Sequence, residues 1–293
     1  MMSDSLNIPL QQVQENLFEE KNIQLFILRE DLIHPQISGN KWRKLKYNIQ
    51  EAKEKGFDTI LTFGGAFSNH IAATATAGKE FGFKTIGIIR GNEVNNSTLD
   101  LATENGMQLK FVSREDYKRK DASQYSECYV IPEGGSNALA VKGCSEIVAN
   151  IDIDYDIICC AVGTGGTISG IISSTDKQVL GFPALKGGEF LKEDIQQLLS
   201  KYNSKKRVSN WHLITDYHFG GYAKIKPELV EFIRSFKKNH NILLDFVYTG
   251  KMLFGLYDMI KNTNQFDNKK IVVVHTGGIQ GNKGFEERFG IVV

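Results

Sequence analysis

The 293-residue sequence predicts an α/β fold built on parallel β-sheets. Short runs rich in β-branched residues alternate with stretches of helical pattern, which is typical of repeated strand–helix–strand units. Several runs are apolar almost throughout, as in YDIICCAV (155–162), and this indicates strands covered by helices on both faces. The expected strands, in chain order, are 58–63, 84–90, 107–113, 128–132, 155–162, 212–215, 243–248 and 269–276.

The helices expected between these strands follow the spacing of their apolar residues. The helical pattern of residues 68–82 ends at Gly82, and glycine is a common C-terminal stop because it tolerates left-handed backbone. Further helical patterns cover 166–174, 226–239 and 250–262. No linker, internal repeat or low-complexity segment interrupts the alternation, so composition alone marks no domain boundary.

GNKWRKLKYNIQEAKEKG (39–56) predicts a helix that begins near Lys41, is capped by Asn40 or Ser38 and ends at Gly56. At about 100° per residue its apolar side chains form one stripe that is expected to be buried. The residues of this stripe are Trp42, Leu45, Ile49 and Ala52.

The lysines of this helix divide by their position on the helical wheel. Lys41 falls roughly 50° from the centre of the apolar stripe, whereas Lys44 and Lys46 fall roughly 90–110° away and, with Arg43, are expected on a solvated face. Lys41 also lies in the first turn, where the helix dipole and partial burial both lower the pKa of an amine. A lysine of lowered pKa attacks carbonyl groups, so Lys41 is a candidate Schiff-base residue; a solvated or phosphate-binding lysine is the alternative.

Composition excludes several classes of function. Thirty-five basic and 34 acidic residues give a net charge of +1, whereas nucleic-acid-binding proteins carry a clear basic excess. The N-terminal segment has early acidic residues and no apolar core, so a signal peptide is not expected, and no apolar run approaches the roughly 18 residues that span a bilayer. The four cysteines lack metal-binding spacing and are expected to be reduced structural thiols of a cytoplasmic protein, namely Cys128, Cys144, Cys159 and Cys160.

The turn FGGAFSNH (63–70) follows an expected strand and opens an alanine-rich helix. Ligands of α/β proteins bind at the carboxyl ends of parallel strands, so such turns are the first places to look for a site. Ser68 and Asn69 are both good N-caps, and a helix start without further function is one interpretation. Backbone amides and two small polar side chains there also suit an anion, which is the functional interpretation.

The turn VGTGGTISG (162–170) has the same strand–turn–helix setting. It is not a dinucleotide fingerprint, because the spacing counted from Gly163 requires glycine where Ile168 stands, and it lacks the Gly-Lys-Ser/Thr of a Walker A loop. A compact loop with many amide donors and two threonine hydroxyls suits a single phosphate monoester on a small cofactor. A tight packing turn is the alternative.

Four other segments and the histidines complete the sequence analysis. In VVVHTGGIQG (272–281), His275 beside glycines is expected to be structural. WHLITDYHFGGYAK (211–224) either lines a cleft or is a packing loop, and the sequence does not choose between the two. The charged segments 118–127 and 200–207 are expected to be solvated loops. The histidines show no metal-ligand spacing, so no catalytic metal is expected.

Seven short motifs in a fixed order resemble a family of pyridoxal-phosphate enzymes with the fold of the tryptophan synthase β-subunit. The motifs run from LREDL (28–32) through GNKWRKLKY, GGAFSNH, IPEGGSN, GTGGT and VYTGKM to HTGG (275–278). More narrowly, the set resembles the 1-aminocyclopropane-1-carboxylate deaminase and D-cysteine desulfhydrase family. This resemblance implies two α/β domains, each a mostly parallel twisted sheet with helices on both faces, and pyridoxal 5'-phosphate in the cleft between them. The large domain would be 1–47 plus 146–293, and 48–145 would be a smaller inserted domain.

The resemblance also implies roles for individual residues. Lys41 would carry the cofactor as a Schiff base, and Asn69 would bond its phenolic oxygen. Ser68, Asn69 and His70 would lie near the substrate carboxylate, and Tyr248 at the substrate. Thr276 would face the pyridine nitrogen. The loop that would hold the phosphate consists of Gly163, Thr164, Gly165, Gly166 and Thr167.

One position departs from the family pattern. Family members often carry a second active-site tyrosine shortly after the last glycine pair, and here Asn282 and Lys283 stand in its place. The resemblance assigns cyclopropane ring opening to the tyrosine pair, whereas simple β-elimination does not need it.

The function expected on this basis is elimination and deamination of a small amino acid by an enzyme of the D-cysteine desulfhydrase type, and the resemblance implies a homodimer. The products would be a 2-oxo acid, ammonia and hydrosulfide. The alternatives are 1-aminocyclopropane-1-carboxylate deamination to 2-oxobutanoate and ammonia, and a non-catalytic ligand-binding member of the fold. A nucleotide-dependent oxidoreductase is disfavoured because the dinucleotide spacing is absent. Nucleic-acid and membrane partners are not expected.

Overall fold

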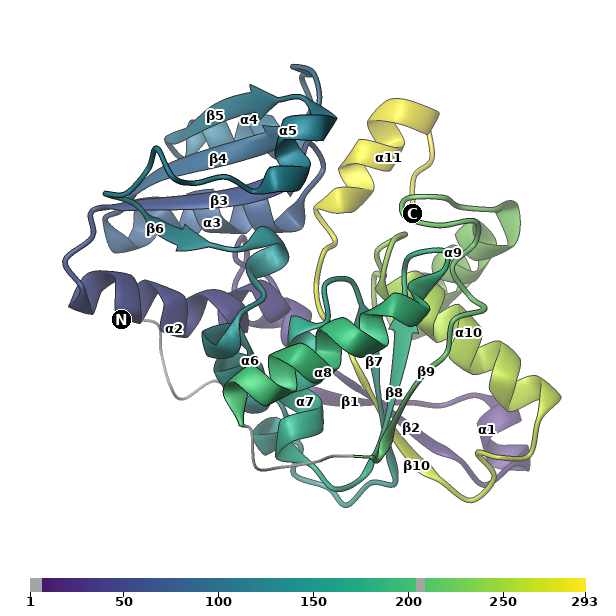
Figure 1. Cartoon of the computed structure of the whole chain (residues 1–293). Coiled ribbons are helices and arrows are strands. Elements are labelled where there is room, and N and C mark those ends of the chain that lie inside the picture. The colour runs from purple at the N-terminus through teal and green to yellow at the C-terminus, as the bar shows by residue number, and fades with distance from the viewer. Residues whose placement is uncertain (1–6, 204–208) are drawn as a thin grey trace.

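The computed structural model describes residues 7–203 and 209–293, and within them the chain forms two β-sheets flanked by helices (Figure 1). The larger sheet has six strands in the order β1-β2-β10-β7-β8-β9, all parallel except that β1 runs antiparallel to β2. Its strands are β1 (Leu10–Val13), β2 (Gln24–Leu28), β7 (Ile157–Val162), β8 (Gln178–Pro183), β9 (Trp211–Leu213) and β10 (Lys270–Val274).

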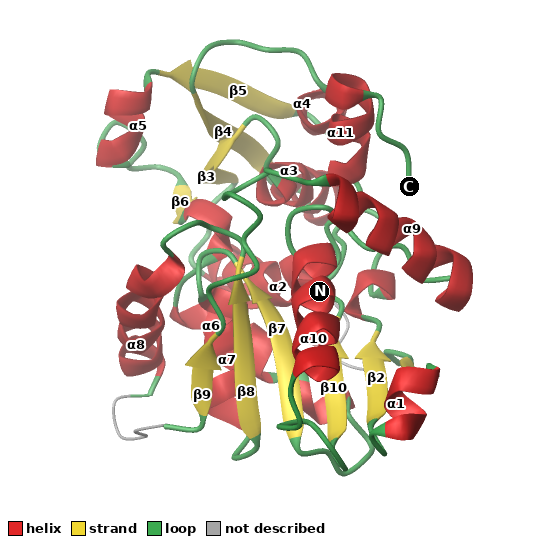
Figure 2. Ribbon diagram, turned by 90° about the vertical axis from the view of Figure 1, so that its right-hand side faces the viewer, coloured by secondary structure: helices red, strands yellow, loops and turns green. Residues whose placement is uncertain are grey.

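The smaller sheet has four parallel strands in the order β5-β4-β3-β6. They are β3 (Thr59–Gly65), β4 (Lys84–Arg90), β5 (Met107–Val112) and β6 (Tyr129–Ile131). All four lie within the segment 48–145 that is expected to form an inserted domain. The boundaries of that domain stay a prediction, and the expected boundary after residue 47 falls inside a helix. Figure 2 shows the two sheets one above the other, with helices between and around them.

Helices cover both faces of the larger sheet because alternate side chains of its central strands point to opposite cores. Ile157 and Cys159 of β7 pack on one face with α9 (Pro227–His240) and α10 (Thr249–Asn262). Neighbouring Ile158 and Cys160 pack on the other face with helices from the middle of the chain. These helices are α6 (Ala138–Ser145), α7 (Gly166–Ser174) and α8 (Leu191–Tyr202).

The smaller sheet is also covered on both faces. Ile60 of β3 packs against α2 (Asn40–Glu54) and α3 (Asn69–Phe81), whereas neighbouring Leu61 packs toward α5 (Arg114–Arg119). The remaining helices are α1 (Asn16–Glu20), α4 (Ser97–Glu104), α11 (Gly281–Phe289) and the 3-10 turns Glu30–Leu32, Glu133–Gly135, Val148–Asn150 and Gly188–Phe190. The C-terminal α11 lies beside the smaller sheet and contacts α4, although it follows the last strand of the larger sheet (Figure 1).

The strand expected at 243–248 is wrong. These residues run without strand partners into the first turn of α10, and side chains bind their backbone instead. The Asp245 carboxylate accepts from the amides of Val247, Tyr248 and Thr249, each at 2.8 Å, and the side chain of Asn282 bonds the 244 carbonyl and the 246 amide. The buried polar groups that a sheet ladder would satisfy are therefore satisfied locally. The strands β1, β2 and β8 were not expected.

The cap and the solvated face expected for α2 are also wrong. The N-cap is Gly39, with φ +62°, while the side chains of Asn40 and Ser38 bond Thr167 and the Asp31 carbonyl. The side chains expected in solvent are buried, with exposed fractions of 2% for Arg43 and Lys44 and 8% for Lys46. The reason is a second contact face: α6 packs so closely on α2 that a Cβ on Gly143 would collide with the Arg43 carbonyl.

Polar partners accompany these buried charges. The Arg43 guanidinium binds the buried Glu30 carboxylate through two nitrogens, at 2.7 and 3.0 Å, and Lys46 binds Glu146 at 2.8 Å. All four cysteines are buried and unpaired, in line with the expected structural thiols. No helix among the described residues combines the length and apolar character needed to cross a membrane. Of the charged segment 200–207, residues 204–207 lie outside the described residues, and 200–202 belong to α8.

Candidate active site

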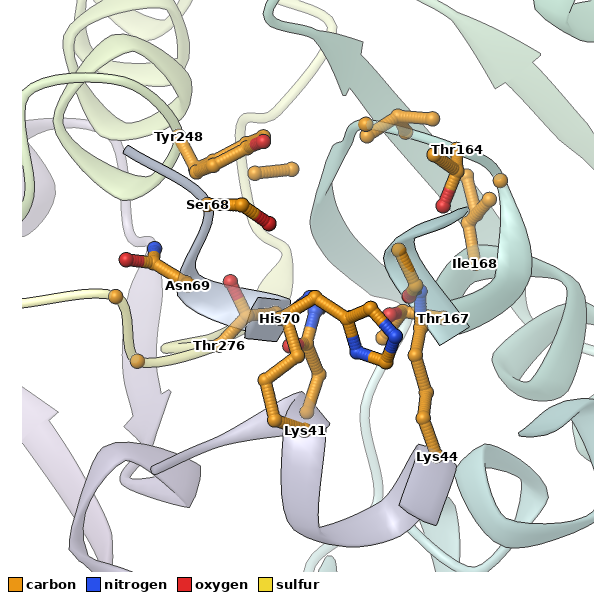
Figure 3. Close-up of a pocket in the computed structure, with 18 of the residues that line it drawn as sticks. Lys41, Lys44, Ser68, Asn69, His70, Thr164, Thr167, Ile168, Tyr248 and Thr276 are labelled. Atoms are coloured by element: carbon orange, nitrogen blue, oxygen red, sulfur yellow. Dashed lines mark hydrogen bonds between the residues drawn. The ribbon is translucent and has the colours of Figure 1, made fainter. Parts of the chain in front are cut away.

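A pocket lies where β3, β7 and β10 end, between the two sheets (Figure 3). In the close-up, Ser68, Asn69 and Thr276 lie on one side, Thr164 and Thr167 on the other, and the lysines rise from α2 below. Every site residue predicted from the sequence lines this pocket except Gly166, which begins α7 beside it. The predicted residues brought together are Lys41, Ser68, Asn69, His70, Gly163, Thr164, Gly165, Thr167, Tyr248 and Thr276.

Lys41 is positioned by close contact between the start of α2 and the end of β10. The Asn40 amide donates to the Thr276 carbonyl at 3.1 Å, and any side chain on Gly39 would collide with that carbonyl. Burial, and to a smaller extent the positive charge of Lys44, lower the pKa of Lys41 to about 7. A substantial fraction of the Lys41 amine is therefore uncharged near neutral pH, as a nucleophile toward an aldehyde must be.

Lys44 is a pocket residue that the sequence prediction missed. Its amine donates to the Gly134 carbonyl at 3.0 Å and to the Ser136 hydroxyl at 3.1 Å, and burial lowers its pKa. It also faces the first turn of α7, since a Cβ on Gly166 would lie 3.2 Å from the Lys44 amine. The available signal was its spacing of three residues from Lys41, which puts both lysines on one side of the helix.

The glycine–threonine loop between β7 and α7 forms the opposite wall. Gly165 has φ +81° and starts α7 without a capping side chain, so the first amides of the helix are left for another acceptor. The hydroxyl of Thr164 lies 2.5 Å from that of Ser136, and Thr167 accepts from Asn40 at 2.9 Å. Backbone amides, a helix N-terminus and a nearby ammonium together form an anion cradle.

The start of α3 supplies the third group of polar side chains. Ser68 is its N-cap and accepts weakly from the Ile71 amide at 3.4 Å. The Asn69 amide oxygen is buried without a hydrogen-bond partner among the described residues, which marks it as a group that awaits a ligand. Asn69 lines the pocket beside Gly278, where a Cβ would lie 2.9 Å from the Asn69 amide nitrogen.

His70 is a neutral member of the pocket wall. The Thr62 hydroxyl donates to the Ile131 carbonyl, so it must accept from His70 Nε2, which lies 2.8 Å away. Burial and the two lysine charges lower the pKa of His70 well below its usual value. The other histidine singled out in the sequence, His275, donates to the Leu243 carbonyl at 2.7 Å and is structural, as expected.

Tyr248 is paired with a second tyrosine from the segment whose role the sequence left open. The rings of Tyr222 and Tyr248 are 6.2 Å apart in an edge-to-face arrangement. Burial raises the pKa of both phenols. Tyr222 belongs to 211–224, so this segment does line the cleft. At the two positions where the family resemblance places a second tyrosine, the Asn282 side chain donates to the Leu244 carbonyl and Lys283 is exposed.

The polar groups of the pocket fit pyridoxal phosphate. An amine of lowered pKa suits its aldehyde, the uncapped start of α7 suits its phosphate, and the NH2 group of Asn69, at the pocket edge, is a donor for a polar ring substituent. Within the described residues, no group of three or more His, Cys, Asp or Glu side chains is arranged to hold a metal ion. The fold and the pocket together therefore define the class of enzymes that carry pyridoxal phosphate on a lysine between two α/β units.

The chain belongs to the pyridoxal-phosphate-dependent enzymes, since the sequence model of that family matches residues 6–277. A Thermotoga maritima protein provisionally named 1-aminocyclopropane-1-carboxylate deaminase is 32% identical over 91% of this chain and 92% of its own length. An Arabidopsis thaliana protein named a bifunctional D-cysteine desulfhydrase and 1-aminocyclopropane-1-carboxylate deaminase is 30% identical over 88% of this chain and 73% of its own. The expected kinship with this group of lyases is thereby confirmed.

Solved structures agree with the fold. A structure described as a 1-aminocyclopropane-1-carboxylate deaminase homologue superposes with a TM-score of 0.87 at 29% identity, covering 98% of this chain and 94% of that one. A fungal L-serine ammonia-lyase from Rhizomucor miehei superposes with a TM-score of 0.70 at 18% identity, covering 97% and 98%. The second likeness shows the shared architecture of two mostly parallel sheets flanked by helices.

Proposed function

We propose that this pyridoxal-phosphate-dependent lyase removes the β-substituent of a small amino acid, with D-cysteine as the first substrate to test. The products are a 2-oxo acid, ammonia and, from cysteine, hydrosulfide. The observation that carries the proposal is the Lys41 amine, whose pKa is about 7, facing the uncapped start of α7 across one pocket. A binding protein without chemistry has no need of such an amine.

The chain's own residues divide the work of holding the cofactor. Lys41 attaches it, and the loop Gly163–Thr167 with the neighbouring Lys44 receives its phosphate. Asn69 bonds the phenolic oxygen, and Thr276, which carries no charge, faces the ring nitrogen. When bound, pyridoxal phosphate supplies an aldehyde for the substrate amine and a ring that withdraws electrons from Cα. A neutral Thr276 leaves the ring nitrogen unprotonated, which favours elimination over transamination.

Substrate handling falls to the residues around the cofactor. Ser68 and Asn69, at the N-terminus of α3, donate to the substrate carboxylate, with the neutral His70 beside them. Once released, the Lys41 amine takes the Cα proton as general base, for which a pKa near 7 is well matched. Tyr248 contacts the substrate from the start of α10.

A second candidate function is deamination of 1-aminocyclopropane-1-carboxylate to 2-oxobutanoate and ammonia. The observation that favours it is the edge-to-face pair of Tyr222 and Tyr248 in the pocket. This pair offers two phenols for ring opening although no tyrosine stands at 282 or 283.

The test begins with the purified protein and added cofactor. We expect a yellow protein that borohydride bleaches, and we expect Lys41→Ala to lose both the colour and turnover. Lys53→Ala, at an exposed position of the same helix, is the matched control and should keep both. A wild-type protein that takes up no cofactor contradicts the proposal.

The substrate is tested with a panel of D- and L-amino acids and 1-aminocyclopropane-1-carboxylate, assayed for 2-oxo acid with hydrosulfide measured in parallel. Hydrosulfide from D-cysteine supports the first function, and 2-oxobutanoate from the cyclopropane substrate without hydrosulfide supports the second. Colour without turnover of any member favours a non-catalytic ligand-binding protein. By family resemblance we also propose a homodimer, which sedimentation would measure.

A further inference from the structure

A second cavity of about 190 Å³ opens directly beyond the cofactor pocket. The two spaces share Asn69, Tyr222, Tyr248 and Gly278 in their linings, so they adjoin. The far wall comes from α11 and from Phe67, in the turn after β3. Nothing in the proposed cofactor chemistry requires this space.

The cavity exists because the first turns of α11 carry glycines and an asparagine whose side chain is hydrogen bonded to the backbone. Gly281 and Gly284 both line it, and a Cβ on Gly284 would already lie 3.0 Å from the Phe67 ring. The Asn282 side chain is small, and hydrogen bonds to the backbone of Phe246 and Leu244 hold its amide at the cavity wall. A tyrosine at 282 or 283, as the family resemblance leads one to expect, is absent.

The lining is mainly apolar and aromatic. Phe67, Phe285 and Val247 are among its apolar residues, and the guanidinium of Arg288 lies over the Phe67 ring, 5.2 Å from its centre. The one carboxylate, on Asp245, is occupied by backbone amides and the Thr249 hydroxyl. Such a wall suits an uncharged apolar or aromatic group. Its transfer from water is favourable, and an aromatic group can also contact the phenylalanine rings and the Arg288 cation.

The size of the cavity fits one aromatic ring. An engineered apolar cavity of about 150 Å³ binds benzene, so a space of about 190 Å³ accommodates a benzyl group. Hydrosulfide, the leaving group of cysteine itself, would leave most of this space empty.

Resting on the proposed lyase function, we propose that the second cavity is the leaving-group subsite for β-substituted alanines whose substituent is a bulky apolar thioether, such as S-benzylcysteine. The Cα–H and Cβ–S bonds of the substrate break, and the electron pair of the Cβ–S bond leaves with the sulfur. The released thiolate is protonated to the thiol. With one water consumed, the products are benzyl mercaptan, pyruvate and ammonium.

The experiment compares cysteine with S-benzylcysteine, each as D- and L-enantiomer, on the cofactor-loaded enzyme. Val247→Phe and, from a different element, Gly284→Leu reduce the cavity; retained yellow colour shows that each variant folds. We expect either filling variant to lower kcat/KM for S-benzylcysteine by roughly tenfold or more. Turnover of cysteine should change far less, and Lys53→Ala, at an exposed position of α2 outside both pockets, should keep both activities.

Binding of benzyl mercaptan to the loaded enzyme, measured by calorimetry, gives a readout that does not depend on turnover. It should bind the wild type and lose affinity in Val247→Phe by a similar factor. Cysteine turnover without S-benzylcysteine turnover or mercaptan binding overturns the subsite and leaves the lyase function standing. An equal loss of both activities in the filling variants overturns it too. No cofactor uptake at all is instead the failure of the lyase proposal.

Discussion

Lys44 is buried and Lys41 half-buried in the same pocket, and the charge of Lys44 acts on Lys41. Burial lowers the pKa of both amines, and the charge of Lys44 lowers that of Lys41 further. Lys44 is held by a carbonyl and a hydroxyl oxygen, which stabilise its ammonium form less than a carboxylate would. The arrangement keeps one amine ready to react and the other available to an anion.

The pH dependence of Lys41 reactivity follows from this pairing. Only the uncharged amine attacks an aldehyde, so in the cofactor-free protein the rate of reaction with pyridoxal should rise with pH to a midpoint near 7, well below the 10.5 of an ordinary lysine. Pyridoxal is used because it lacks the phosphate that Lys44 would bind. Rates are measured by borohydride trapping and mass spectrometry, relative to a free lysine derivative in the same buffers.

A charge substitution tests the coupling between the two lysines. Lys44→Met removes a positive charge, so the pKa of Lys41 and the midpoint of its reaction should move to higher pH. Lys53→Met, at an exposed position of α2, should leave the midpoint in place. A wild-type midpoint near 10, or a shift to lower pH in Lys44→Met, would contradict the account.

The sequence predicts the burial of a side chain when its own helix decides it, and fails to predict burial that depends on residues distant in the chain. The buried stripe of α2 follows from spacing alone, and so does the partial burial of Lys41. Lys44 contacts Gly134 and Arg43 contacts Glu146, both far along the chain. A helical wheel of α2 alone cannot predict these contacts. Tyr222 likewise reaches Tyr248 only through the tertiary fold.

Among the elements, the strand–turn–helix units are predictable because strand pattern, glycine turn and helix start all agree. The helix α7 begins and ends where the sequence indicates, at Gly166 and Ser174. The strand β8 was missed since Gly181 and Pro183 resemble a turn. Gly181 is needed there for packing: a Cβ would collide with Ile168 of α7.

The start of α2 offers a prediction at the scale of the element. Gly39→Ala should disrupt the contact with Thr276, because its φ of +62° is unfavourable for alanine and its Cβ would collide with the 276 carbonyl. We expect a loss of roughly 2–4 kcal/mol in the free energy of unfolding, measured by denaturant titration, together with weaker pyridoxal phosphate uptake.

Gly56→Ala is the matched control for this substitution. Gly56 follows the same helix with φ +74°, yet a Cβ there meets no atom within 4 Å. It should therefore cost only about 1 kcal/mol, from the backbone alone, and leave cofactor uptake unchanged. Equal effects of the two substitutions would show that the close approach to Thr276 does not position Lys41.

Across the whole molecule, the pocket depends on two sheets that are formed by different parts of the chain. Ser68, Asn69 and His70 follow a strand of the smaller sheet, whereas the loop Gly163–Thr167 and Thr276 follow strands of the larger one. The parallel sheets and their helices are predictable from alternation, but the sequence does not show that α11 returns to the smaller sheet. That return, through α4, builds the second cavity.

A ligand that contacts both sheets should stabilise both. Pyridoxal phosphate binds the folded chain only, so at a free concentration of 100 times its Kd it should add about 2.7 kcal/mol to the free energy of unfolding. Hydrogen exchange should slow at the start of α3 and at the start of α7 together, since one ligand contacts both helix ends. Pyridoxamine phosphate, which has no aldehyde, is the control: it should protect the same two helix ends in the wild type and in Lys41→Ala alike. Protection confined to α7 would mean that the phosphate binds without the smaller sheet closing on the ring, and it would contradict the placement of Asn69 beside the cofactor.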